Sequence, residues 1–98
     1  MKRQKEIKLN DFQLNVLLSE KEKKGYRYLL DNGVYCSGCQ GICKKGVEIK
    51  SVKLDGLNDI VVEGTCNACG RRVARVMEFG EDPEFFEKAM NFRKSLQN

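Results

Sequence analysis

Two short cysteine motifs constrain this chain more than any other feature. Two residues separate Cys36 from Cys39, and two separate Cys66 from Cys69. This spacing lets one tight turn direct both sulfur atoms at one point, and four thiolates suit the tetrahedral coordination of Zn²⁺. The four cysteines are therefore predicted to hold one zinc ion. Because four thiolates leave no coordination position open for a substrate, we expect the ion to be structural.

The cysteine count and the termini favour a metal site over disulfides. The chain has five cysteines in 98 residues, and an odd number fits a disulfide framework poorly. The basic start of the chain is not followed by the apolar segment of a secretory signal, and no run approaches the roughly 20 apolar residues of a membrane span. We therefore expect a cytoplasmic protein that does not enter a membrane and whose thiols stay reduced.

The residue types present predict a function other than catalysis. Histidine, the commonest general base, is absent from the chain. The sequence shows neither a nucleophile paired with a base nor a glycine loop that could hold phosphate. A binding module is therefore expected rather than an enzyme.

The segment between the two cysteine motifs predicts an antiparallel β-hairpin. Residues 47–54 and 60–65 are rich in β-branched side chains and are joined by a turn signal. The apolar alternation changes parity within the first of these strands, which predicts a β-bulge near Lys50 or Ser51. Because 26 residues separate the two cysteine motifs, a long spacer, the hairpin is expected to protrude.

A helix is predicted on each side of the hairpin. Ser19 and Glu22 form a capping-box pattern, which predicts a helix over residues 20–31. Asp82 followed by proline predicts the start of a C-terminal helix, whose last turn carries Arg93 and Lys94, where cations are favoured. The apolar residues of that helix are Phe85, Phe86, Ala89, Met90, Phe92 and Leu96. They are expected to pack on the sheet, and the alternative is a homodimer or a groove for a protein partner.

The N-terminal segment is less clearly patterned. Residues 1–8 are expected to form a charged, mobile leader. Residues 9–18 fit either a strand or a short helix capped by Asn10 or Asp11.

A cysteine turn, a hairpin, a second cysteine turn and a further strand over residues 71–79 together resemble the zinc-ribbon superfamily. The resemblance covers residues 34–79 and rests on CSGC at 36–39 and CNACG at 66–70. It implies one structural zinc held by Cys36, Cys39, Cys66 and Cys69. With the two predicted helices, the expected fold is α+β: a zinc ribbon with a three-stranded antiparallel sheet, flanked by an N-terminal and a C-terminal helix. The predicted single domain spans 1–98, with a leader and helix at 1–33, the ribbon at 34–80 and the C-terminal helix at 81–98.

Other metals and a fifth cysteine leave alternatives open. Rubredoxins hold iron between two such turns, but this chain lacks tryptophan and the proline usual in their second turn. An iron–sulfur centre could use Cys36, Cys39, Cys43 and one distal cysteine. Cys43 is expected to be a small buried side chain, and the alternatives are a substitute ligand or a redox-sensitive thiol.

Basic residues are concentrated in the first half of the chain and beside the cysteines. Residues 1–53 carry a net charge of +6 and residues 54–98 a net of −2. The candidate phosphate-binding residues are Lys44, Lys45, Lys50, Lys53, Arg71 and Arg72. They fit a nucleic-acid-associated or regulatory adaptor, or a local offset of the −2 charge of a zinc tetrathiolate. No aromatic residue is interleaved with the hairpin lysines, so base stacking on the hairpin is not expected.

Overall fold

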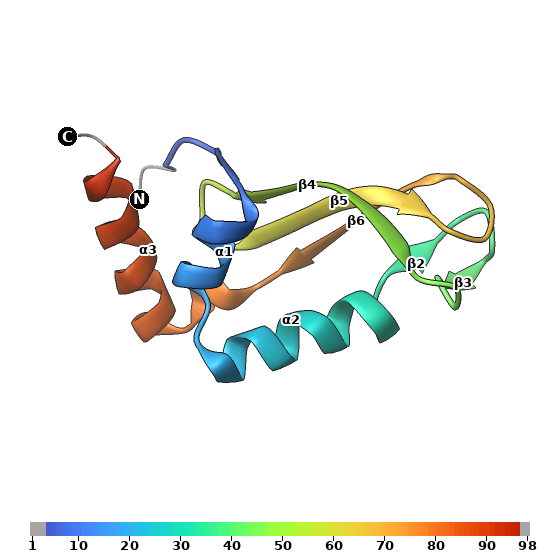
Figure 1. The fold of residues 1–98 in the computed structure, drawn as a ribbon, viewed down its shortest axis with the longest axis horizontal. Coiled ribbons are helices and arrows are strands. Elements are labelled where there is room, and N and C mark those ends of the chain that lie inside the picture. The colour runs from blue at the N-terminus through green and yellow to red at the C-terminus, as the bar shows by residue number, and fades with distance from the viewer. Residues whose placement is uncertain (1–3, 97–98) are drawn as a thin grey trace.

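An antiparallel sheet runs along the 42 Å long axis of the molecule in the computed structural model, which describes residues 4–96 (Figure 1). Its strands, in spatial order, are β1 (Ile7–Leu9), β4 (Val47–Leu54), β5 (Ile60–Cys66) and β6 (Arg72–Met77). A second, two-stranded sheet pairs β2 (Tyr35–Cys36) with β3 (Gly41–Ile42). The α+β class is confirmed, and the small sheet lies at one end of the large one.

The helices lie along the sheet and across its other end. They are α1 (Asp11–Leu17), α2 (Glu20–Asn32), the 3-10 turn η1 (Phe79–Glu81) and α3 (Pro83–Ser95). In Figure 1, α2 runs lengthwise toward β2, and α3 crosses the end of the sheet farthest from β2 and β3. The molecule therefore has a helical end and an end that carries the cysteine turns.

The caps predicted from sequence are present at the two long helices. Ser19 Oγ accepts a hydrogen bond from the Glu22 N–H at 3.2 Å, and Glu22 Oε1 accepts one from the Ser19 N–H at 2.8 Å. Asp82 accepts from the Glu84 N–H at 3.0 Å, directly before Pro83. Such contacts satisfy N–H groups that a helix leaves unpaired at its start. Both long helices thus begin directly after the capping residues that were predicted from the sequence.

The predicted bulge is confirmed in β4. Its register against β5 shifts between Ile49 and Ser51, which leaves Lys50 as the extra residue. By register, the shift keeps Val47 and Ile49 on the same face of the sheet as Val52 and Leu54. Gly64 lies opposite the bulge, where an added Cβ would be 2.1 Å from the Glu48 carbonyl oxygen. No side chain fits at that position.

The prediction of a three-stranded sheet is wrong, because the N-terminal segment adds a fourth strand. β1 pairs with the free edge of β4, with Leu9 opposite Val52. Of the predicted leader, residues 1–3 lie outside the described residues, while Ile7 and Lys8 belong to β1. Pairing with β1 gives hydrogen-bond partners to the backbone groups at the edge of β4. A three-residue strand is too short to be recognised from its own pattern.

Residues 9–18 follow the helical alternative for most of their length. Asn10 Oδ1 accepts from the Gln13 N–H at 2.7 Å, and Gln13 Oε1 accepts from the Asn10 N–H at 2.9 Å. This reciprocal pair starts α1 and turns the chain away from β1. The local cap therefore outweighs the strand-like alternation of the segment.

The main core lies between the large sheet and the helices. Its buried residues are Leu9, Leu17, Leu18, Val52, Leu54, Ile60, Val62, Met77, Phe85 and Ala89. Tyr26 of α2 and Phe92 of α3 pack against this cluster. The expected packing of α3 on the sheet is confirmed. Phe86 and Met90 lie outside the cluster and are half-buried, so a homodimer through α3 stays a prediction.

The tip of the β4–β5 hairpin does not protrude, contrary to expectation. Arg93 of α3 donates from Nε to Asn58 Oδ1 at 2.8 Å, from Nη2 to the Asp55 carbonyl at 2.6 Å, and from Nη1 to the Lys5 carbonyl. Asn58 is fully buried there. Burial also lowers the pKa of Arg93. Arg93, which the sequence predicted only as a cation at the end of the helix, is therefore buried and holds the hairpin tip against α3.

Candidate metal centre

The cysteine motifs occupy two turns held side by side at one end of the molecule. Cys36 ends β2, and Cys66 ends β5. The Cys66 N–H donates to the Arg71 carbonyl at 2.8 Å, which closes the second turn. Asn67 joins the second turn to the segment between β3 and β4: its backbone N–H donates to the Gly46 carbonyl at 3.0 Å, and its Nδ2 donates to the Lys45 carbonyl at 3.1 Å.

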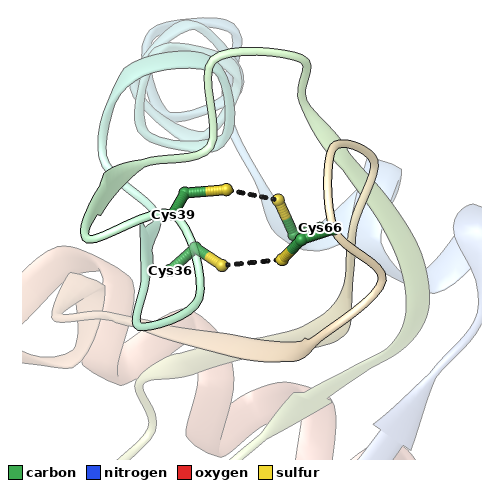
Figure 2. A group of neighbouring side chains, drawn as sticks. Cys36, Cys39 and Cys66 are labelled. Atoms are coloured by element: carbon green, nitrogen blue, oxygen red, sulfur yellow. Dashed lines mark hydrogen bonds between the residues drawn. The ribbon is translucent and has the colours of Figure 1, made fainter.

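The four predicted sulfur atoms converge as a metal site requires. Cys36 Sγ lies 3.4 Å from Cys69 Sγ, and Cys39 Sγ lies 3.8 Å from Cys66 Sγ (Figure 2). All four atoms lie within 4.8 Å of one another. Sulfurs bound tetrahedrally at the usual zinc distance would be about 3.8 Å apart. The donor set and its spacing therefore fit one Zn²⁺ ion.

Backbone N–H groups of the turns favour the thiolate form of two ligands. Those of Cys39 and Gly38 lower the pKa of Cys36. In the second turn, the N–H groups of Cys69 and Ala68 lower the pKa of Cys66 to about 6. Thiolates are the form that binds metal, and such donors are the usual outer shell of a zinc–cysteine site. In each turn, backbone N–H groups thus favour the thiolate form of the first cysteine, which is the form that binds a metal ion.

The pKa of Cys39 shows that charging all four sulfurs is unfavourable in the absence of a cation. Contacts with the sulfurs of Cys66 and Cys69 raise the pKa of Cys39 to about 12. Thiolates packed this closely repel one another unless a positive ion lies between them. Zinc would supply that charge and join the two turns.

Cys43 is a buried neighbour of the site and lies outside the group of four sulfurs. It packs with Val34, Cys36, Cys66 and Val73 in a second apolar cluster. Burial raises the pKa of its thiol to about 12. The expectation of a small buried side chain is confirmed, and the geometry lends no support to Cys43 as a ligand.

Four of the six candidate phosphate-binding residues lie at the end that carries the cysteine turns. They are Lys44, Lys45, Arg71 and Arg72, and all are exposed. Arg71 reaches across to the first turn, where its Nη1 donates to Ser37 Oγ at 3.4 Å. The tertiary structure therefore brings cations from both cysteine motifs to one end of the molecule.

The other two candidates, Lys50 and Lys53, belong to β4 and pair with carboxylates. Lys50 forms an ion pair with Glu48. Lys53 Nζ lies 3.1 Å from Glu63 Oε1 and 3.3 Å from Glu6 Oε2. The structure does not place these two lysines with the other four.

The sequence analysis did not identify one exposed pair of side chains at the same end of the molecule. Tyr35 and Ile42 lie directly opposite each other across β2 and β3, and they are 60% and 39% exposed. Strands of two residues carry no periodic signal, so the sequence offered no reason to bring them together.

A methyl group at Gly38 is expected to weaken zinc binding. A Cβ there would lie 2.8 Å from Cδ of the flexible Arg71 side chain and 3.0 Å from Cys69 Sγ, so the Cys69 sulfur must shift by a few tenths of an ångström. We expect Gly38→Ala to lower zinc affinity by about 10- to 100-fold, the usual effect of disturbing groups next to metal ligands. Competition with a chromophoric chelator measures this. Gly41→Ala is the control, because nothing lies within 4 Å of its Cβ position, and equal affinities of the two variants would contradict the prediction.

Comparison with known proteins does not assign this chain to a family, so its class of protein rests on the fold and the cysteine cluster. No protein-family model, curated protein or solved structure matches this chain. Among residues 4–96, no helix has the length and apolar character needed to cross a membrane. The fold and the four-cysteine cluster are those of a small α+β protein with a potential metal site, consistent with a zinc-ribbon-like centre.

Proposed function

We propose that this protein is a zinc-binding, non-enzymatic module whose metal end binds the phosphates of nucleic acid. By metal end we mean residues 34–47 and 64–73, which include both cysteine turns. One observation carries the proposal: these segments contain four cations and no acidic residue. Four thiolates around Zn²⁺ would bring a formal charge of −2. The cations exceed that charge, so offsetting the metal site does not account for all of them.

The surroundings of the cations support the same function. Within residues 4–96, no carboxylate lies at ion-pair distance from Lys44, Lys45, Arg71 or Arg72. By contrast, the lysines of β4 have carboxylate partners. Lys53 and, over a longer distance, Arg72 lower the pKa of Glu63, so Lys44, Lys45 and Arg71 are the cations most available to a polyanion. Phosphate contacts of this kind position a protein without reading sequence.

Binding to nucleic acid is expected to depend strongly on salt. Contact with four phosphates predicts that affinity falls about 100-fold when salt rises from about 50 mM to about 200 mM. Fluorescence anisotropy of labelled DNA and RNA with the zinc-loaded full chain measures this. Lys44→Gln with Lys45→Gln removes two contacts and is expected to make the logarithmic slope shallower by about 1.8.

The matched control is the double variant Lys50→Gln and Lys53→Gln, which removes the same charge from residues that already have carboxylate partners. It is expected to leave most of the salt dependence in place. An affinity that does not change with salt concentration, or equal effects of the two double variants on the salt dependence, would count against the proposal.

A further inference from the structure

We infer that the metal end takes single-stranded rather than duplex nucleic acid, with one base stacked on Tyr35. This inference rests on the function proposed above. Tyr35 is 60% exposed, and its cross-strand partner Ile42 is 39% exposed. Between residues 33 and 77 no other aromatic residue occurs. The exposed pair is therefore the place at this end where the face of a base could stack.

The backbone that carries Tyr35 is anchored on both sides. Val34 and Cys36, its neighbours in sequence, are 2% and 0% exposed. The Cys43 N–H donates to the Val34 carbonyl at 2.9 Å, which ties β2 to the chain beyond β3. Because side chains alternate along a strand, burial of both neighbours directs the tyrosine outward. A ring held in this way loses little conformational freedom when a base covers it.

Cations lie close along the chain to both members of the exposed pair. Lys44 follows Ile42 by two residues, and Arg71 contacts Ser37, two residues after Tyr35. An aromatic ring beside cations is the combination by which proteins bind single strands without sequence preference. An acidic protein segment would use the cations but would gain less from the ring, so we favour the nucleic acid.

The shape of the metal end argues against a duplex as the ligand. In a duplex the base faces are covered by their neighbours, and entry into the major groove takes a helix or a two-stranded ribbon. β2 and β3 have two residues each, and α2 ends at Asn32, before the cysteine turns. Within residues 4–96 no helix extends into the metal end, and the longer strands that reach it, β4, β5 and β6, are part of the four-stranded sheet.

The test compares a mixed-sequence single strand of about ten nucleotides with its duplex, using the zinc-loaded full chain. Tyr35→Ala is expected to weaken single-strand binding by about 5- to 150-fold, the range that the stacking of one base supports, and to change duplex binding much less. Tyr28→Ala is the matched control, because Tyr28 lies on α2 and is 65% exposed. It is expected to leave single-strand affinity unchanged.

A second variant gives a readout that does not depend on loss of affinity. The chain has no tryptophan, so Tyr35→Trp introduces a single fluorescent reporter. We expect this variant to keep its affinity and to be quenched by the single strand but not by the duplex. This measurement decides the question if Tyr35→Ala loses zinc or fails to fold.

Different failures separate the inference from the proposed function. Salt-dependent binding with equal affinities of Tyr35→Ala and Tyr28→Ala, or with an unquenched tryptophan, overturns the stacking inference and leaves the phosphate contacts standing. Absence of salt-dependent binding to any oligonucleotide, or tighter binding of an acidic peptide, overturns the proposed function and the inference with it.

Discussion

Cys66→Ser is expected to abolish stoichiometric zinc binding and to unfold the metal end, while Cys43→Ser keeps the ion. Cys66 Sγ is one of four sulfurs that lie within 4.8 Å of one another, and Cys43 is outside that group. Loss of one thiolate breaks the tetrahedral set, and a structural zinc site contributes its binding free energy directly to folding. Both cysteines are buried, at 2% and 0% exposure, so each serine places a hydroxyl in similar surroundings.

Native mass spectrometry measures the zinc stoichiometry, and amide hydrogen exchange shows where protection is lost. In Cys66→Ser we expect exchange to rise in β2, in β3 and in the turn between β5 and β6, the segments that carry or adjoin the four sulfurs. The main core at the other end contains none of the four cysteines and should keep more of its protection. Retention of one zinc ion by Cys66→Ser, or its loss from Cys43→Ser, would contradict the proposed ligand set.

Arg93→Met is expected to be the most destabilising substitution at the helical end, by about 3–5 kcal/mol. Arg93 is only 6% exposed, and its guanidinium serves three acceptors, on Asn58, Asp55 and Lys5. Methionine fills much of the same space but donates no hydrogen bond. Asn58 Oδ1 would then stay buried without this donor, which costs more than the hydrogen bond contributes when it is made.

Urea unfolding of the zinc-loaded protein measures this loss of unfolding free energy. Lys94→Met is the matched control, since Lys94 is the exposed neighbour of Arg93 in the last turn of α3. It is expected to change stability by less than about 0.5 kcal/mol. Zinc stoichiometry should stay the same in both variants, because Arg93 lies at the end opposite the cysteines. Equal stabilities of the two variants would show that Arg93 acts only as a charge at the helix end.

The features that the sequence predicted correctly are those set by short-range chemistry. The cysteine pairs, the caps at Ser19 and Asp82, and the bulge at Lys50 each follow from residues a few positions apart. Two residues between cysteines select a turn, and a change of parity in an apolar strand requires an extra residue. The ligand set was predictable for the same reason, because each half of it is contained in one local motif.

Only the tertiary structure decided which distant groups share a surface. Ile7 and Lys8 become a strand because β4 has a free edge, and Arg93 becomes a buried clamp because the hairpin tip folds under α3. Lys53 is paired with Glu63 from the neighbouring strand, while Tyr35 is left exposed beside the metal site. These outcomes depend on contacts between residues far apart in the chain, and neither composition nor periodicity records which of those contacts form. The sequence by itself determined two cysteine turns and their local supports, and the packing of the chain brought their four sulfurs together and determined which charges and which ring remain exposed.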